Sequence, residues 1–204
     1  EGQAVIYKEI AEEGYSHAER LHVFIEELIH EAGISFQDVK AIAVSQGPGS
    51  YTGLRIGVSA AKGLCYALNI PLIAVDTLKV LASQANVDNG LIVPMLDARR
   101  MEVYSAIFNT KLEKQREIQA EVITENSFED VTEMVYFVGD CADKCKAVLT
   151  KPNFIFLEET KYPSAKEMSA ISFSKFQNSD FQDVAYFEPY YLKDFMITTS
   201  KKVG

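Results

Sequence analysis

The most constraining feature of this sequence is a glycine-rich loop between a short apolar segment and a helical segment. Residues 41–44 are wholly apolar, and the loop that follows reads Ser45-Gln46-Gly47-Pro48-Gly49-Ser50-Tyr51-Thr52-Gly53. Residues 54–68 have helical periodicity until Pro71 forbids continuation, and 72–75 are again wholly apolar. Short apolar runs of this kind are typical of strands buried on both faces. The sequence therefore predicts a right-handed strand–helix–strand unit with the loop at its first turn.

The loop has the residue types of an anion-binding turn without the spacing of a known one. Glycines let a backbone or ligand approach closely, and a loop that opens a helix can point N–H groups at a phosphate. No Gly-Lys-Ser/Thr follows, and the glycines are spaced one residue too long for the dinucleotide fingerprint. A structural turn is therefore favoured over a phosphate site. The residues of this structural glycine loop are Gly47, Pro48, Gly49, Ser50, Tyr51, Thr52 and Gly53.

Small residues recur along one face of the helix after the loop. Gly53, Gly57 and Ala61 are four residues apart. A glycine inside a helix costs about 1 kcal/mol relative to alanine, so Gly57 indicates that something packs too closely for a Cβ. The neighbour is either the chain's own sheet or a helix of another subunit.

An amphipathic helix is predicted before this unit, and a second group of elements after it. Apolar residues recur at helical spacing between Leu21 and Ile29, Ser16 and Glu19 have the spacing of a capping box, and Gly33 is a good terminator. Further strands are predicted at 4–11, 91–96, 102–108, 118–124, 135–138 and 154–157, and further helices at 78–85, 127–134, 140–149 and 164–176. We expect two lobes, residues 1–90 and 91–204, the second with a frayed tail from 198.

The turn between two of these strands carries a group of charges. Asp97-Ala98-Arg99-Arg100 lies between the segments 91–96 and 102–108 and looks like a hairpin or tight crossover. Asp97, Arg99 and Arg100 form either an ion-paired turn or a contact to phosphate. The ion-paired turn is favoured.

Charge and cysteine content exclude several classes of function. The chain has 20 Lys and Arg against 29 Asp and Glu, a net charge of −9, which argues against gripping a nucleic-acid backbone alone. Cys65, Cys141 and Cys145 are too few for a secreted disulfide framework and indicate a reducing cytoplasm. No apolar run approaches the roughly 18 residues of a membrane span.

Neither the cysteines nor the histidines have the spacing of a metal site. Cys141 and Cys145 are four residues apart, but no further ligands accompany them. His17, His22 and His30 all lie in the first helical segment. The first two cannot share a helix face, and the last two are too far apart along the axis to chelate together. The sequence therefore predicts no metal, and no general acid–base pair stands out.

Several segments together resemble a known family. In order and approximate spacing they are similar to the signature of the bacterial TsaB (YeaZ) family of tRNA threonylcarbamoyladenosine biosynthesis proteins, in the glycoprotease-like M22 group. The matching segments are 45–57, Ala61-Lys62-Gly63-Leu64, Asp97-Ala98-Arg99-Arg100, Glu102-Val103-Tyr104 and Pro189-Tyr190-Tyr191-Leu192-Lys193, and His17-Ala18-Glu19-Arg20-Leu21 resembles the family's first helix.

The resemblance implies a fold. It is the α/β actin/hexokinase/Hsp70-like (ASKHA) fold of two lobes, which begins with a strand that bears a phosphate loop. We expect that first strand to be missing from this chain, with Glu1-Gly2 as the turn into the second strand.

The resemblance also implies a subunit that is not itself an enzyme. The catalytic relative TsaD holds a metal with a histidine pair on the helix after the strand that follows the glycine motif. The corresponding residues 75–81 contain no histidine, so no catalytic residue, metal or cofactor is expected. The implied partners are a TsaD-like catalytic subunit and a TsaE-like ATPase, with a homodimer of the isolated chain, only indirect contact to tRNA, no membrane, and a cytoplasmic location.

The two helices around the glycine loop are the implied partner interface, with the residues Leu21, Ile25, Leu28, Gly53, Arg55, Gly57, Ala61 and Leu64. On this interpretation, a bulky residue at Gly57 or Ala61 would abolish association and leave the monomer folded. Three alternatives remain: a metallopeptidase-like enzyme, a stand-alone nucleotide-binding or ATPase module, and a homodimeric regulator with no role in tRNA modification.

Overall fold

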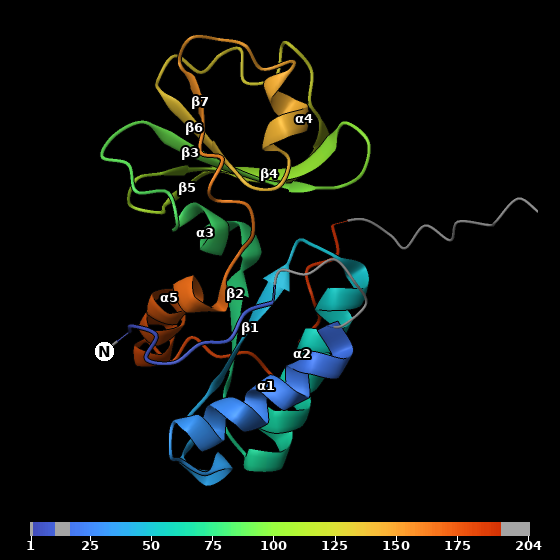
Figure 1. Cartoon of the computed structure of the whole chain (residues 1–204), viewed down its shortest axis with the longest axis vertical. Coiled ribbons are helices and arrows are strands. Elements are labelled where there is room, and N and C mark those ends of the chain that lie inside the picture. The colour runs from blue at the N-terminus through green and yellow to red at the C-terminus, as the bar shows by residue number, and fades with distance from the viewer. Residues whose placement is uncertain (1, 11–16, 193–204) are drawn as a thin grey trace, which may run out of the picture.

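The computed structural model describes residues 2–10 and 17–192, and these form two lobes around two β-sheets (Figure 1). The lower lobe in Figure 1 contains two parallel strands, β1 (Ile42–Gly47) and β2 (Leu72–Asp76). The upper lobe contains a five-stranded sheet in the order β5-β4-β3-β6-β7. One short helix, α3 (Thr77–Ala82), lies between the two sheets.

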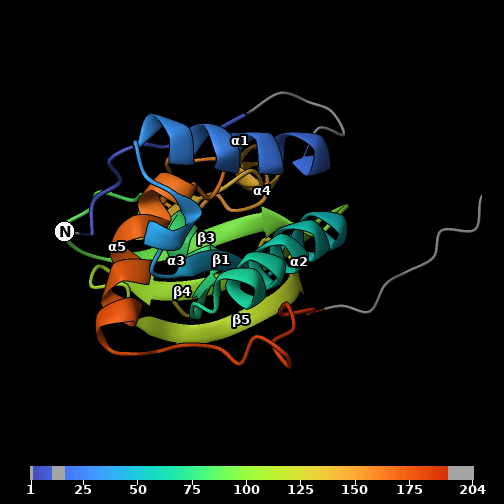
Figure 2. The same cartoon turned by 90° about the horizontal axis from the view of Figure 1, so that it is seen from below.

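The predicted strand–helix–strand unit is confirmed in the lower lobe. It consists of β1, helix α2 (Tyr51–Leu68) and β2, and Ile42 lies opposite Leu72 in the parallel register. Helix α1 (His17–Glu31) lies beside α2, and a short 3-10 helix, Phe36–Asp38, connects it to β1 (Figure 2). Among the described residues, no helix is long and apolar enough to cross a membrane.

Each face of the lower sheet is covered by a different helix. On one face α2 packs on the strands, with Val44, Val58, Ala61, Cys65 and Leu72 as the buried residues. On the other face lies α5 (Ala165–Gln177), whose Met168 and Ile171 pack against Ile73 and Val75 of β2. The sheet is therefore sandwiched between a helix from the first half of the chain and a helix from its end.

The upper lobe is built from one continuous stretch of chain. Strand β3 (Leu91–Asp97) pairs antiparallel with β4 (Glu102–Asn109), and β4 pairs antiparallel with β5 (Lys114–Val122). On its other side β3 pairs parallel with β6 (Val135–Val138), which pairs with β7 (Phe154–Phe156). Helix α4 (Ala142–Lys146) contributes to the core on one face, and α3 to the core on the other.

Helix α3 belongs to both hydrophobic cores. Leu78 and Leu81 are fully buried among residues of the upper sheet, whereas Val80 packs with Ile73 and Val75 of the lower sheet. Asp76 caps the helix, because its carboxylate accepts hydrogen bonds from the backbone N–H groups of Leu78 and Lys79.

Three expectations differ from the structure. Residues 2–10 form no strand, although one was predicted at 4–11. Residues 127–130 form turns and 131–134 are irregular, where a helix was predicted, and Phe128 has a φ of +61° and is buried in the upper core. The division at residue 90 does not separate the lobes, because α5 and the residues after it return to the lower sheet.

The predicted cap at Ser16, the final residue of the Pro189–Lys193 match and the tail from 198 lie outside the described residues.

Shortening a buried side chain of α3 will test whether this helix joins the cores. We expect Leu81→Ala to lower the free energy of unfolding by about 2–5 kcal/mol, because it leaves a cavity between the sheets. Lys79→Ala on the same helix removes a partly exposed side chain and is expected to change it by less than about 0.5 kcal/mol. Urea unfolding measures both, and equal stabilities would show that α3 is not a joint core element.

Candidate functional site

The glycine loop is shorter than its sequence suggests. Strand β1 continues to Gly47 and α2 begins at Tyr51, so three of the seven predicted loop residues are already helical. Ser50 caps the helix, because its Oγ accepts a hydrogen bond from the Gly53 N–H at 3.3 Å. The loop proper is therefore Pro48, Gly49 and Ser50, a tight strand-to-helix turn.

Gly47 is required by a contact within the chain. Its φ is +109°, and a Cβ built there would lie 2.8 Å from the carbonyl oxygen of Tyr190 and 3.1 Å from Leu54 Cδ1. The Tyr190 N–H in turn donates to the carbonyl oxygen of Gln46 at 2.7 Å. The space left by this glycine is thus filled by backbone from the end of the chain, which supports the structural interpretation of the loop.

That backbone belongs to residues 181–192, which we call the strap. The Gln182 N–H donates to the carbonyl oxygen of Leu72 at 2.8 Å. The Lys62 ammonium of α2 donates to the carbonyl oxygens of Ala185 and Phe187 at 3.1 and 2.9 Å. The strap therefore crosses from the start of β2 to the end of β1 along α2, as the red chain in Figure 2 shows. Sequence reasoning missed the strap, because an irregular segment has no hydrophobic period.

The ends of the lower strands are held by hydroxyl and charge contacts. Ser45 Oγ and Thr77 Oγ1 are 2.6 Å apart, and Thr77 Oγ1 also accepts from the Gly47 N–H at 3.0 Å. The Asp76 carboxylate forms an ion pair across the lobes with Lys114 of β5 at 3.1 Å. Burial would lower the pKa of Lys114, but Asp76 and Glu117 outweigh burial and raise it. These contacts fix the geometry between the lobes and leave no activated nucleophile among themselves.

The charged turn after β3 is an ion-paired turn, but the cation differs from the two expected. Asp97 pairs with Lys144 of α4, whose ammonium also donates to the carbonyl oxygens of Arg100 and Glu102. Asp97 Oδ1 accepts from the Arg99 N–H at 3.1 Å, and both arginines have positive φ values. The side chains of Arg99 and Arg100 are exposed, and the phosphate alternative gains no support from this arrangement.

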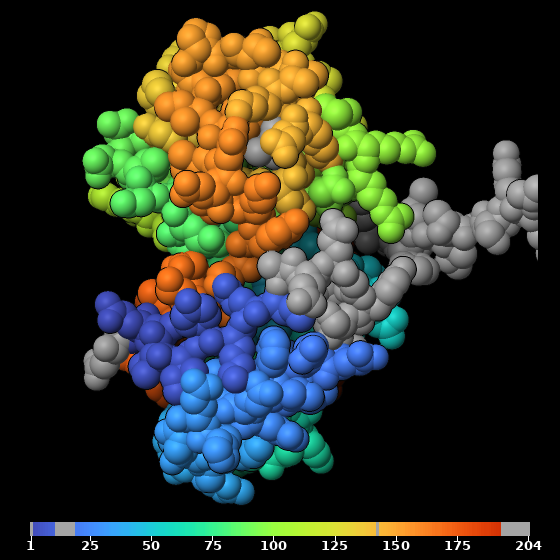
Figure 3. Space-filling model, viewed as in Figure 1, coloured from blue at the N-terminus to red at the C-terminus, as the bar shows by residue number. Residues whose placement is uncertain are grey.

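On α1 the predicted interface residues lie on a face that the chain itself buries only in part. Leu21, Ile25 and Leu28 are all partly exposed, as are Phe24 and Ile29 of the same stripe. Figure 3 shows that the helix lies on the surface of the lower lobe. This half-covered apolar stripe has the character of a docking surface.

On α2 the predicted interface residues fall on different faces. Arg55 is exposed, and Gly53, Gly57 and Leu64 are partly exposed. Ala61 is only 4% exposed and packs in the core with Val44 and Leu72, so its place in the interface is corrected to the chain's own sheet.

The space around Gly57 also differs from the expectation. A Cβ there would meet Val44 Cγ2 at 3.8 Å, an ordinary contact. The described chain therefore does not explain this glycine by close packing on its own sheet.

The exposed face of α2 extends beyond the predicted interface residues. Besides Arg55 it carries Thr52, Ser59, Gly63 and Tyr66, which helical periodicity places on the same side, and the last three were not singled out in the sequence as site residues. The Arg55 guanidinium lies over the Tyr51 ring at 5.6 Å, and that ring packs on Tyr191 of the strap at 5.0 Å. Plotting the helix with its buried face would have found this side, but not its contact with the strap.

The described residues do not fit a metal centre. They contain no group of three or more His, Cys, Asp and Glu side chains that would hold an ion. His22 and His30 are exposed on α1, and all three cysteines are free and buried. Burial raises the pKa of Cys145 to about 11 and raises that of Cys141 further, so neither thiol is activated.

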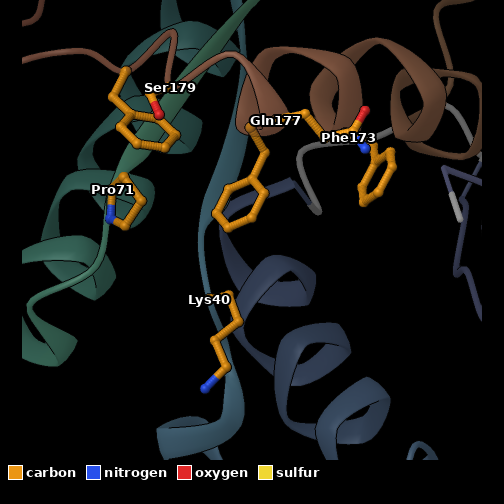
Figure 4. Close-up of a pocket in the computed structure, with 7 residues that line it drawn as sticks. Lys40, Pro71, Phe173, Gln177 and Ser179 are labelled. Carbon is orange, nitrogen blue, oxygen red and sulfur yellow. The ribbon is translucent and has the colours of Figure 1, made fainter.

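A hollow of about 600 Å³ lies at the opposite end of the lower sheet from the glycine loop (Figure 4). It is open to solvent and lined by Lys40, Pro71, Phe173, Phe176, Gln177, Ser179 and Phe181. Lys40 and Pro71 precede β1 and β2, whereas Gly47 ends β1. No predicted site residue lines this hollow, so it is separate from the interface predicted on α1 and α2.

Filling the space at Gly47 will test the contact with the strap. We expect Gly47→Ala to displace Tyr190 and to speed hydrogen exchange of its amide, because the new Cβ meets a backbone oxygen at a positive φ. Gly49→Ala is the matched control, since nothing lies within 4 Å of its Cβ position. Hydrogen exchange followed by mass spectrometry measures both, and unchanged exchange in Gly47→Ala would contradict the contact.

The two sides of α2 are expected to respond differently to a larger residue. Ala61→Leu overpacks the core and should lower the free energy of unfolding by about 1–3 kcal/mol. Ser59→Leu adds the same side chain on the exposed face and should change it by less than about 0.5 kcal/mol. Urea unfolding compares the variants. A stable Ala61→Leu monomer would restore Ala61 to the surface.

Curated relatives are similar over the region that contains these features. The tRNA threonylcarbamoyladenosine biosynthesis protein TsaB of Bacillus subtilis is 42% identical over 96 residues, which are 47% of this chain and 42% of that protein. TsaB of Escherichia coli is 38% identical over 92 residues, 44% of this chain and 40% of that protein. The chain thus aligns with about two fifths of the length of these relatives.

A solved structure and a family model extend the similarity to most of the chain. YeaZ from Pseudomonas aeruginosa superposes with a TM-score of 0.74 at 24% identity, over 86% of this chain and 84% of that one. The expected α/β fold of the actin/hexokinase/Hsp70-like type is therefore confirmed. The family model described as TsaD, tRNA N6-adenosine threonylcarbamoyltransferase, matches residues 9–200. This chain belongs to the TsaD family.

Proposed function

We propose that this chain is a non-catalytic subunit of the bacterial complex that forms threonylcarbamoyladenosine in tRNA, and that it docks through α1 and α2 on a TsaD-like catalytic subunit. The observation that carries the proposal is the half-covered apolar stripe of α1. Similarity to proteins named for this biosynthesis supports the process, and the stripe supports the role of a docking subunit.

The apolar stripe of α1 is covered only in part by the chain's own fold. Its five apolar residues recur at helical spacing, and α1 packs beside α2 without burying any of them: Leu21, Phe24, Ile25, Leu28 and Ile29. A surface helix of a globular protein normally covers such a stripe against its core. A partner helix laid on α1 and α2 would remove the remaining apolar surface from water.

The chemistry of the described residues supports a role without catalysis. The three histidines of the chain all lie on α1, four or more residues apart. The hydroxyls of Ser45 and Thr77 hydrogen-bond to each other. Asp97 is tied to Lys144. These two pairs are thus occupied in holding the fold.

The partners proposed are the TsaD-like subunit and a TsaE-like ATPase, in the cytoplasm, with a homodimer of the isolated chain through the same helices. A net charge of −9 supports indirect contact to tRNA, because phosphate binding depends on clustered Lys and Arg. A catalytic role is the second candidate, since the family description names a transferase.

Charge on the α1 stripe is expected to break the complex. Ile25→Glu with Leu28→Glu should weaken binding to the TsaD-like subunit at least tenfold, because both carboxylates would have to be desolvated in the interface. Glu26→Gln on the polar face of α1 is the control and should bind as the wild type does. Co-purification and calorimetry measure binding, and circular dichroism checks the fold. Full binding by the double variant would contradict the interface.

A modification assay on unmodified tRNA separates the two roles. The complete mixture should form threonylcarbamoyladenosine, and omission of either this chain or the TsaD-like subunit should abolish it. Product formed by this chain without the TsaD-like subunit would establish the catalytic alternative.

A further inference from the structure

Several backbone positions with a positive φ carry side chains that the fold itself accounts for. Among the described residues, six that are not glycine have a positive φ: Asn69, Arg99, Arg100, Leu112, Phe128 and Ser179. Such a φ brings the Cβ close to the following carbonyl oxygen, which is unfavourable for most residues and least so for asparagine. Phe128 is buried in one core of the upper lobe, and Leu112 packs against the other. Asn69 is the tolerated residue type, and Ser179 has a short side chain. Of the six, only the two arginines have no such reason.

Arg99 and Arg100 are consecutive in the turn between β3 and β4. Their φ values are +76° and +56°, and both side chains are exposed. Neither guanidinium forms a hydrogen bond or an ion pair within the part of the chain that the structure describes. Glycine at either position would relieve the unfavourable contact of the Cβ. The described chain therefore gives no reason for arginine at these positions.

The surrounding residues hold the turn in this unfavourable conformation. Asp97 Oδ1 accepts from the Arg99 N–H at 3.1 Å, and the Lys144 ammonium donates to the carbonyl oxygen of Arg100 at 2.8 Å. Asp140 accepts from the Asp97 N–H at 2.9 Å, which ties the turn to the segment before α4. Strained backbone persists only where such contacts over-determine it, and it is concentrated at functional sites. The turn therefore extends two guanidinium groups into solvent from a fixed backbone.

The charges around the turn favour carboxylates over a phosphate backbone as the ligand. Lys144 is occupied by Asp97 and by two carbonyl oxygens, so the free cations of the turn are the two arginines. Asp97 and Asp140 bring two negative charges to the base of the turn. A nucleic-acid backbone is bound by several clustered cations, whereas a single guanidinium forms two parallel hydrogen bonds with a single carboxylate. The turn thus fits two neighbouring carboxylates of a protein.

We propose that the strained turn between β3 and β4 presents Arg99 and Arg100 to two neighbouring carboxylates of a partner protein. This site lies in the upper lobe, whereas the interface proposed on α1 and α2 lies in the lower lobe (Figure 1). It goes beyond the proposed function and rests on it only for the proteins used as probes, the TsaD-like subunit and the TsaE-like ATPase.

Glycine substitutions separate the effect of the arginines on the fold from their role in binding. We expect Arg99→Gly and Arg100→Gly each to raise the melting temperature by about 2–4 °C, because glycine adopts a positive φ freely. Lys111→Gln is the control, because it removes an exposed cation in the turn between β4 and β5 at a position without a positive φ. Differential scanning calorimetry measures all three. Melting temperatures of the glycine variants that stay equal or fall would show that the arginines serve the fold, and would overturn the proposal.

The double variant Arg99→Gly/Arg100→Gly tests the contact with a partner. It should weaken binding of the TsaD-like subunit or of the TsaE-like ATPase at least tenfold, whereas Lys111→Gln should bind both proteins as the wild type does. Arg99→Lys/Arg100→Lys should have an intermediate affinity, because lysine keeps the charge and loses the paired hydrogen bonds. Isothermal titration calorimetry at low and high salt measures the affinities, and the wild-type affinity should depend on salt more steeply than that of the double glycine variant. Full affinity of the double glycine variant for both proteins would overturn the proposal.

The outcomes separate this inference from the proposed function. Loss of binding in the α1 double variant, together with full binding of both proteins by the double glycine variant, overturns the inference and leaves the proposed function intact. A wild-type chain that binds neither protein overturns both. A double glycine variant that keeps full affinity for both proteins and loses affinity for tRNA overturns the protein ligand in favour of phosphate.

Discussion

Helix α3 has only six residues, and its side chains pack into two separate hydrophobic cores. Leu78 and Leu81 pack against the upper sheet and Val80 packs against the lower one. A rotation of one lobe relative to the other would therefore expose leucine or valine to water. The position of β2, whose last residue caps this helix, follows from the same burial. This small helix therefore helps to set the orientation of the lower lobe, together with the Asp76–Lys114 ion pair between the lobes.

The parts of the fold that follow from short-range pattern could be predicted from the sequence. The unit β1–α2–β2 was recognisable because apolar runs, a helical period and Pro71 are all local signals. The strap and the Asp97–Lys144 pair were not, because they join residues far apart in the chain and leave no periodic trace. The prediction of a helix at 127–134 was wrong, because burial of Phe128 at a positive φ overrides the helical propensity of this segment.

The candidate site shows the same limit at the scale of one helix. Spacing grouped Gly53, Gly57 and Ala61 on one stripe, but spacing alone does not say whether a stripe faces inward or outward. Packing against Val44 turns Ala61 into the core and leaves Arg55 and Tyr66 outside. The contact that supports a structural turn at the glycine loop, the backbone of Tyr190, lies more than a hundred residues away along the chain.

The return of the chain to the lower lobe has a consequence for its synthesis. All strands of the upper sheet lie within residues 91–157. A ribosome therefore synthesises these strands in one uninterrupted stretch. The lower sheet must wait, because α5 and the strap, which pack on or bond to β1 and β2, are translated after the upper sheet. Domains form as their residues emerge, so the nascent chain carries a finished upper lobe while the α5 face of β1 and β2 is still uncovered. A stop codon after the upper lobe would therefore remove α5 and the strap. The lobe that loses its covering is the lower one, although the deleted residues follow the upper lobe in sequence.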